Sequence, residues 1–264
     1  MKRNCIRIVV LSLVFLPQYA SALDGAVPVS SDSTSSALQS APARSDNAPQ
    51  AGIVTSDKRA DLAREPASRD VRHIADWVVD SGDNRNLPFV IIDKTEAKIF
   101  VFDASGRIRG AAPALLGLAR GDDAVPGIGD RELSRIRPEE RTTPAGRFVA
   151  ERGTSIRGKN TEDIVWVDYD SGVSLHRVIT GNPRDRRLER LATPTPADNR
   201  ISYGCINVPA AFYNNVVNPS FTGTSGIVYV LPETRPVRQV FGSYDVGERR
   251  HYAAQPPQNQ PDLP

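Results

Sequence analysis

Residues 89–102, FVIIDKTEAKIFVF, decide how this sequence is expected to fold. Two blocks rich in β-branched and aromatic residues, 89–93 and 98–102, read as two β-strands. Residues 104–106, Ala-Ser-Gly, then supply the small residues of the tight turn that closes a hairpin. The folded part of the chain is therefore expected to begin near Leu87, and to begin with strands.

Further strand candidates follow along the chain. They are 107–118, 146–152, 163–169, 173–179 and 226–231. Two polar segments, 119–143 and 182–200, read as loops, and 208–217 reads as a helix with Pro209 in its first turn. Many short strands with little helix predict a mainly β domain, a sandwich or barrel-like fold with one or two short helices, over residues 87–245.

The regions outside this domain have their own compositions. Residues 1–22 carry three basic residues, an apolar core and the small-residue motif Ala20-Ser21-Ala22, which is typical of a cleaved signal peptide. Residues 23–69 are rich in Ser, Ala and Pro and are expected to be a disordered tether. Residues 70–86 are expected to form a short helix and lead-in, and 246–264 a flexible tail rich in Pro and Gln.

The composition excludes several classes of function. The formal charge of +2 gives no broad basic field, so no nucleic-acid partner is expected. No apolar run reaches the roughly 18 residues of a spanning helix, so no transmembrane segment is expected after signal cleavage. Two cysteines and three histidines offer little for a metal centre, and neither a metal nor a cofactor is expected.

Cys205 is the one cysteine left once the signal peptide is removed. Gly204 allows a sharp backbone bend before it, and the N–H groups around the bend could face a developing oxyanion. A thiol needs a base to become a nucleophile, and His176 is the histidine inside the folded part. A Cys205–His176 dyad is one interpretation; the other is that both are ordinary core residues.

The motif around this cysteine resembles that of a known family. Residues 202–207, Ser-Tyr-Gly-Cys-Ile-Asn, are similar to the Ser-x-Gly-Cys-apolar-Arg/Asn signature of L,D-transpeptidase catalytic domains. The hairpin at 91–102, the segment 142–148 (Thr-Thr-Pro-Ala-Gly-Arg-Phe) and the position of His176 also match in order. The resemblance covers about residues 87–232.

The resemblance implies an exported bacterial enzyme of the periplasm or cell-wall space that acts on peptidoglycan stem peptides without a cofactor. Cys205 would be the nucleophile and His176 the base, with its ring oriented by the carbonyl of Arg177. The backbone N–H groups of Tyr203, Gly204 and Cys205 would hold the oxyanion.

Some features depart from the family pattern or leave alternatives open. Many members have a second histidine at the position of Tyr203, and glycine or serine at that of Arg177. The stretch 182–200 lengthens the gap between His176 and Cys205 and is either a lid or a tolerated insertion. Its mixed charges suit a solvated loop or a guide for an anionic polymer.

Two supporting residues also have two interpretations each. Ser202 either holds the turn or orients His176, and Asn207 either caps the following helix or touches substrate. At the level of function, the alternatives to a transpeptidase are an L,D-carboxypeptidase or hydrolase with the same dyad, or an inactive wall-binding protein of this fold.

Overall fold

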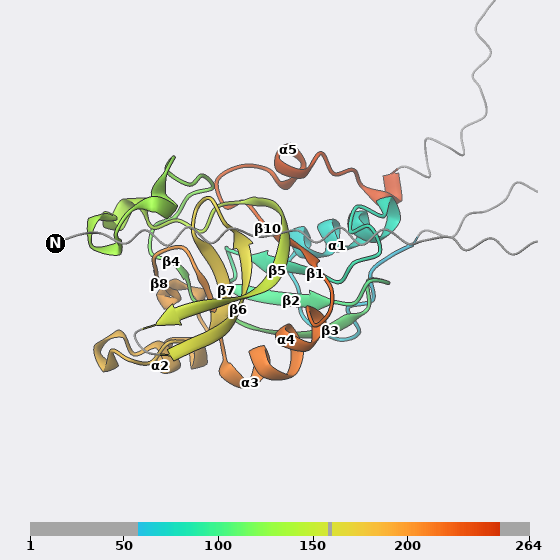
Figure 1. The fold of residues 1–264 in the computed structure, drawn as a ribbon. Helices are drawn as coiled ribbons and strands as arrows, with labels where there is room; N and C mark the ends of the chain where they lie inside the picture. The colour runs from blue at the N-terminus through green and yellow to red at the C-terminus, as the bar shows by residue number, and fades with distance from the viewer. Residues whose placement is uncertain (1–57, 158–159, 249–264) are drawn as a thin grey trace, which may run out of the picture. The chain divides into compact units, whose positions relative to one another are not determined.

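One curled sheet of eight strands forms the centre of the structure, a computed structural model that describes residues 58–157 and 160–248. Its strands are β1 (Phe89–Asp93), β2 (Lys98–Phe102), β3 (Ile108–Pro113), β5 (Gly146–Arg157), β6 (Asn160–Asp168), β7 (Val173–Arg177), β9 (Ile206–Val208) and β10 (Gly226–Val230). They lie in the order β3-β2-β1-β10-β5-β6-β7-β9 (Figure 1). The prediction of a mainly β fold is confirmed.

The sheet nearly closes on itself. The Leu115 N–H donates to the Asn207 carbonyl at 2.8 Å, and the Asn207 N–H donates back at 2.9 Å. These bonds join the last strand of the order, β9, to the chain just after β3. A small parallel pair, β4 (Leu116–Gly117) and β8 (Arg200–Ser202), continues from this junction.

Hydrophobic side chains fill both faces of the central strands. Successive residues of a strand point to opposite faces. Val90 and Ile92 of β1 therefore join the core inside the curled sheet, whereas Phe89 and Ile91 join a second core beneath helix α1 (Arg69–Ser81). This double burial explains why β1 is an unbroken apolar run.

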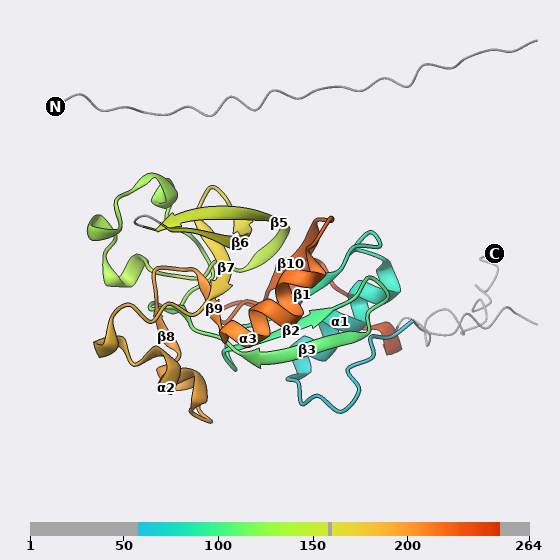
Figure 2. The same cartoon turned by 60° about the horizontal axis from the view of Figure 1, so that its bottom comes forward.

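Helices cover the two faces. Helix α1 is capped by Ser68, whose side chain accepts from the Val71 N–H, and it ends at Gly82 with φ of 70°. The opposite face is covered by α3 (Ala210–Phe212), a π-helical turn (Tyr213–Val217) and α4 (Asn218–Ser220) (Figure 2). The predicted helix at 208–217 starts later than expected, because Val208 ends β9 and Pro209 is the N-cap.

The two predicted loops contain short ordered elements. Three 3-10 turns lie between residues 128 and 140. The stretch 182–200 contains α2 (Arg187–Ala192), and another short helix, α5 (Val237–Phe241), follows β10. The structure thus contains more helical segments than the one or two that the sequence suggested.

The chain from residue 58 onward packs against the domain. The Asp61 N–H donates to the Gly106 carbonyl at 2.9 Å, the Ile108 N–H donates to the Asp61 carbonyl at 2.8 Å, and Leu62 is buried. The last residues of the expected tether, from 58 to 68, are therefore ordered and belong with the domain. The rest of the tether, the signal peptide and the tail beyond residue 248 lie outside the described residues.

Within the described ranges, no helix combines the length and the apolar character needed to cross a membrane.

Candidate active site

Strand pairing brings the dyad residues to one place. Strands β7 and β9 are parallel neighbours in which Leu175 pairs with Ile206 and His176 with Asn207. Because side chains alternate along a strand, His176 and Ser174 lie on the face of β7 that continues to Cys205, just before β9. Strand pairing thus brings together His176 and Cys205, which are 29 positions apart in the sequence.

The Cys205 thiol is half-buried and has polar neighbours. Its Sγ lies 3.6 Å from the Ser174 Oγ and 3.7 Å from the Gly172 carbonyl oxygen. Burial raises the pKa of the thiol, but a hydrogen bond with His176, the electrostatic effect of its ring and a hydrogen bond with Ser174 outweigh burial and lower the pKa from 9.0 to about 7. A substantial fraction of Cys205 is therefore thiolate at neutral pH.

The His176 ring is held in one tautomer. Its Nδ1 lies 2.7 Å from the carbonyl oxygen of Arg177. A carbonyl only accepts hydrogen bonds, so Nδ1 carries the proton and Nε2 carries the lone pair. His176 is 5% exposed, which limits competition from water for its two nitrogens. The ring is thus arranged as a base toward the thiol.

The bend before Cys205 is closed by Ser202. Its Oγ donates to the Cys205 carbonyl at 2.6 Å and accepts from the Gly204 N–H at 3.1 Å. These bonds support the first of its two interpretations, that Ser202 holds the turn, and no hydrogen bond between Ser202 and His176 is found among the described residues. Gly204 has φ of 132°, and a Cβ there would lie 2.8 Å from the Thr142 carbonyl oxygen, so both conformation and space require glycine.

The backbone donors at this bend differ from those that the family resemblance implied. The Gly204 N–H is already engaged by Ser202. Among the described residues, no acceptor is found for the N–H groups of Tyr203 and Cys205. Those two groups remain available to an oxyanion beside the thiol.

Thr143 supports the site, although from the sequence it was named only as part of the family-like segment 142–148. Its hydroxyl donates to the Gly204 carbonyl at 2.8 Å and accepts from the Gly117 N–H at 2.9 Å. The side chain is buried, so both bonds are protected from water. The Thr-Pro-x-Gly segment therefore fixes the bend that carries Cys205, which its place in the family pattern could have suggested.

Behind Thr143 lies a buried lysine. Lys94 Nζ donates to the carbonyls of Thr143 at 3.0 Å and Gly121 at 2.5 Å and to Asp122 Oδ1 at 2.8 Å. Burial lowers the pKa of Lys94, and the Asp122 carboxylate opposes that effect. A single charged group thus links the β1–β2 turn to the segment that supports Gly204.

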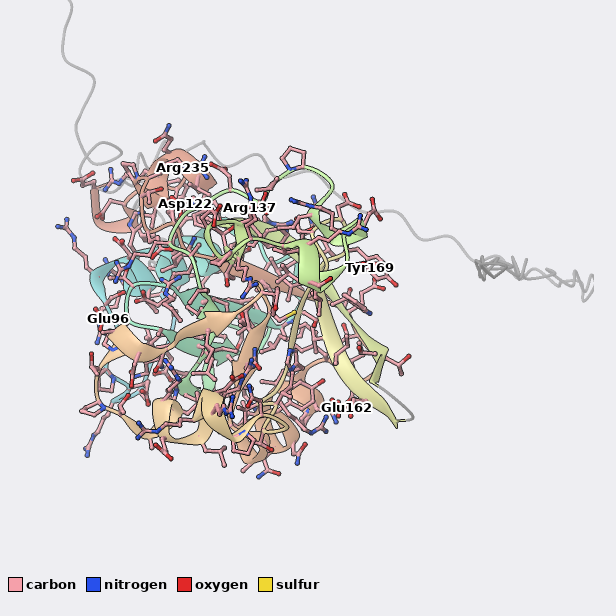
Figure 3. The ribbon with its side chains drawn as sticks, turned by 90° about the vertical axis from the view of Figure 1, so that its left-hand side faces the viewer. Glu96, Asp122, Arg137, Glu162, Tyr169 and Arg235 are labelled. Carbon is pink, nitrogen blue, oxygen red and sulfur yellow. The ribbon has the colours of Figure 1, made fainter. Side chains whose placement is uncertain are left out.

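The acids around Lys94 are paired in turn. Asp122 accepts from the backbone N–H groups of Glu233 and Thr234, and Arg235 lies 3.6 Å from its Oδ2. Figure 3 labels Asp122 and Arg235 in the same part of the view. Glu233 also binds Arg200 at 2.6 Å. This network ties the chain after β10 to β8, the strand that leads into the Cys205 bend.

Asn207 neither caps a helix nor faces open solvent. It lies within β9, is 1% exposed, and donates from Nδ2 to the Cys205 carbonyl at 3.2 Å. Its Oδ1 accepts from Arg187 of α2 at 3.1 Å. The helix-capping interpretation is wrong, because Asn207 falls in a strand three residues before α3 begins.

The side chain of Arg177 is held by its neighbours. It pairs with Asp163 at 2.8 Å, donates to Asn214 at 2.7 Å and stacks on the Tyr213 ring at 4.4 Å. Its bulk is therefore accommodated within these contacts. Tyr203 is 37% exposed, with the Arg141 guanidinium 3.9 Å from its ring centre, and it forms an outer edge of the site.

No group of three or more His, Cys, Asp or Glu side chains suitable for a metal ion is found in the described part of the chain.

Comparisons with known proteins give distant likenesses. No protein-family model and no curated protein matches the chain. Among solved structures, the chain is similar to the Ldtfm–avibactam carbamoyl enzyme, with 15% identity and a TM-score of 0.33 over 55% of this chain and 49% of that one. It is also similar to the L,D-transpeptidase from Xylanimonas cellulosilytica, with 17% identity and a TM-score of 0.34 over 55% of this chain and 60% of that one. The chain thus spans about half the length of the structures that it matches.

Proposed function

We propose that this protein is an exported, cysteine-dependent L,D-transpeptidase that remodels peptidoglycan cross-links. The observation that carries the proposal is the Cys205 thiol, whose pKa is lowered to about 7 beside a His176 ring held by the Arg177 carbonyl. The motif at 202–207 and the signal-like residues 1–22 support the substrate and the periplasmic or wall location.

The residues suit acyl transfer in two steps. His176 takes the thiol proton, and the Cys205 sulfur bonds to the carbonyl carbon of the third stem residue. The N–H groups of Cys205 and Tyr203 stabilise the oxyanion. The bond to the terminal D-alanine breaks, and its amine leaves with the proton from His176. An amine of a second stem then attacks the thioester, which releases the thiol and forms the new cross-link.

The test uses the purified full chain with disaccharide-tetrapeptides and mass spectrometry of the products. We expect cross-linked dimers, and we expect neither dimer nor tripeptide with Cys205→Ala or His176→Ala. His73→Ala is the matched control. The His73 ring forms a hydrogen bond with the Ser243 hydroxyl, beside α1, so we expect this variant to keep its activity. Incubation with a carbapenem is expected to give a covalent adduct on Cys205 only.

The other functions give different outcomes of the same experiment. Tripeptide without dimer, unaffected by added acceptor stem, would identify a carboxypeptidase with the same dyad. Wall binding that survives Cys205→Ser, with no product and an unreactive thiol, would identify an inactive binding protein and refute the proposal.

A further inference from the structure

The loop at 182–200 reaches the Cys205 bend through Arg187. Helix α2 of this loop lies beside β8, the strand that leads into the bend (Figure 2). Arg187, the first residue of α2, donates from Nη1 to Asn207 Oδ1 at 3.1 Å, and Asn207 Nδ2 donates to the Cys205 carbonyl at 3.2 Å. Two hydrogen bonds in series therefore join the loop to the residue that carries the thiol.

The chemistry of the end groups fixes the direction of both bonds. A guanidinium only donates and a carbonyl oxygen only accepts, so the Asn207 amide turns its oxygen to Arg187 and its NH₂ to Cys205. Asn207 is 1% exposed, which limits the replacement of either partner by water. A positively charged donor on Oδ1 also polarises the amide and strengthens its donation to the Cys205 carbonyl.

The bond from Asn207 completes the support of the peptide units on both sides of Cys205. The Gly204 carbonyl, which shares a peptide plane with the Cys205 N–H, accepts from Thr143 at 2.8 Å. The Cys205 carbonyl accepts from the Ser202 hydroxyl at 2.6 Å as well as from the Asn207 amide. Because both planes are held, the Cys205 N–H has a fixed direction, as an oxyanion donor requires.

Arg187 is itself held in place. Its Nε donates to Asp185 Oδ2 at 2.9 Å, and its side chain is 13% exposed. Asp185 accepts in turn from Asn182 at 2.7 Å, and its carbonyl accepts from Arg190 at 2.8 Å. Arg190 also donates to the Asp198 carbonyl at 2.5 Å, which ties the start of the loop to its end. Such internal bonding favours a fixed support over a lid that opens.

We propose that Arg187 is a positioning residue for acyl transfer, and that it acts through Asn207 to hold the Cys205 bend in the form that stabilises an oxyanion. This role deepens the proposed function and rests on it, because a fixed oxyanion site serves a thiol that forms acyl intermediates. The loop at 182–200 is then neither a lid nor a tolerated insertion, but a part of the site.

The test compares two reactions of Cys205 in the purified full chain, followed by mass spectrometry. Iodoacetamide alkylates the sulfur by direct displacement of iodide, without an oxyanion. p-Nitrophenyl acetate acylates it: the sulfur bonds to the acetyl carbonyl carbon, an oxyanion forms, and p-nitrophenolate leaves as its C–O bond breaks. The same thiolate takes part in both reactions, so the ratio of the two rate constants reports the oxyanion site.

Arg187→Met removes the donors and keeps an unbranched side chain. We expect acylation of Cys205 to slow about tenfold and alkylation to change less than about twofold. The alkylation midpoint near pH 7 is expected to stay in place, because His176 and Ser174 lower this pKa. A general loosening of the fold would change both reactions. Arg187→Lys supplies one charged donor without the planar fork, and we expect it to recover part of the acylation rate.

Arg186→Met is the matched control. Arg186 precedes Arg187 in the same loop and pairs with Glu189 at the surface, where its side chain is 70% exposed, so we expect the wild-type ratio of acylation to alkylation. Asn207→Ala tests the route. If Arg187 acts through Asn207, the double variant Arg187→Met/Asn207→Ala is acylated at the rate of Asn207→Ala alone.

The positioning role is overturned if p-nitrophenyl acetate does not acylate wild-type Cys205, if Arg187→Met keeps the wild-type ratio, if Arg186→Met lowers the ratio equally, or if the effects of Arg187→Met and Asn207→Ala multiply. Failure of the proposed function has a different signature. A wild-type chain that gives neither dimer nor tripeptide from tetrapeptides, but whose ratio depends on Arg187, keeps the positioning role and refutes the transpeptidase. Cross-linking with a ratio that is independent of Arg187 does the reverse.

Discussion

The lowered pKa of Cys205 predicts a pH dependence that belongs to a single residue. Burial raises this pKa, and the hydrogen bond and charge of His176 bring it to about 7. The thiolate accumulates above the pKa, so the rate of alkylation by iodoacetamide is expected to rise through a midpoint near pH 7 and then level off. In His176→Ala, burial still raises the pKa of Cys205, but the main effects that lower it, the hydrogen bond and charge of His176, are lost. The midpoint is therefore expected to move upward, toward or beyond 9.0.

Mass spectrometry of labelled Cys205 across pH measures this midpoint. His73→Ala is expected to leave it in place. An unchanged midpoint in His176→Ala would show that the imidazole does not lower the pKa of the Cys205 thiol, even though strand pairing brings the two residues to one place.

Gly204 supports a second prediction at this scale. An alanine there would need φ near 132° and would place its Cβ 2.8 Å from the Thr142 carbonyl. We expect Gly204→Ala to abolish carbapenem labelling of Cys205 and to lower the free energy of unfolding by about 2 kcal/mol or more. Gly223→Ala is the matched control, because Gly223 also has positive φ but has open space around its Cβ position, and we expect about 1 kcal/mol and normal labelling. Equal effects of the two variants would contradict the role given to the close contact.

At the scale of elements, Lys94 connects the β1–β2 turn to the segment that supports the Cys205 bend. Lys94→Met leaves the buried Asp122 carboxylate without its closest cation, so we expect about 3 kcal/mol lower stability in urea denaturation. The carbonyl of Thr143 also loses a donor, and slower labelling of Cys205 should accompany the loss. Lys98→Met removes a half-exposed pair with Glu65 and is expected to cost about 1 kcal/mol or less. The same stability loss in both variants would argue against the buried network.

The elements also show how far sequence reasoning reaches. Strands β1 and β2 match their predicted bounds, because unbroken β-branched and aromatic runs leave few alternatives. The three-residue strand β9 was missed, since its pairing with β7 is a long-range contact without a local signal. That omission allowed the helix-capping interpretation of Asn207, which is wrong. The proposed roles of Cys205 and His176 rest on their chemistry and on the family motif.

The buried charges were not predicted for a related reason. Lys94 and Asp122 lie in polar stretches that resemble ordinary turns and loops, and only tertiary packing shows that they meet.

For the whole molecule, the described part of the chain begins at Lys58, and its first residues already pack against the domain. Leu62 is 7% exposed within the core beneath α1, the Asp61 backbone pairs with the β2–β3 turn, and Ser68 caps α1. A chain that begins at Lys58 is therefore expected to unfold at the temperature of the full chain. One that begins at Arg69 loses the burial of Leu62, about 2 kcal/mol, together with the backbone bonds of Asp61, so its Tm is expected to fall by at least about 4 °C.

Differential scanning calorimetry of the two truncated chains compares these temperatures directly. Leu62→Ala in the full chain separates the apolar contact from the backbone bonds, and we expect it to account for only part of the loss, because the Asp61 pairing is retained. Equal Tm values for the chains that begin at Lys58 and Arg69 would place the start of the stable unit at α1. In that case the tether would extend to residue 69, the bound expected from the sequence, because a composition rich in Ser, Ala and Pro does not indicate the residue at which packing begins.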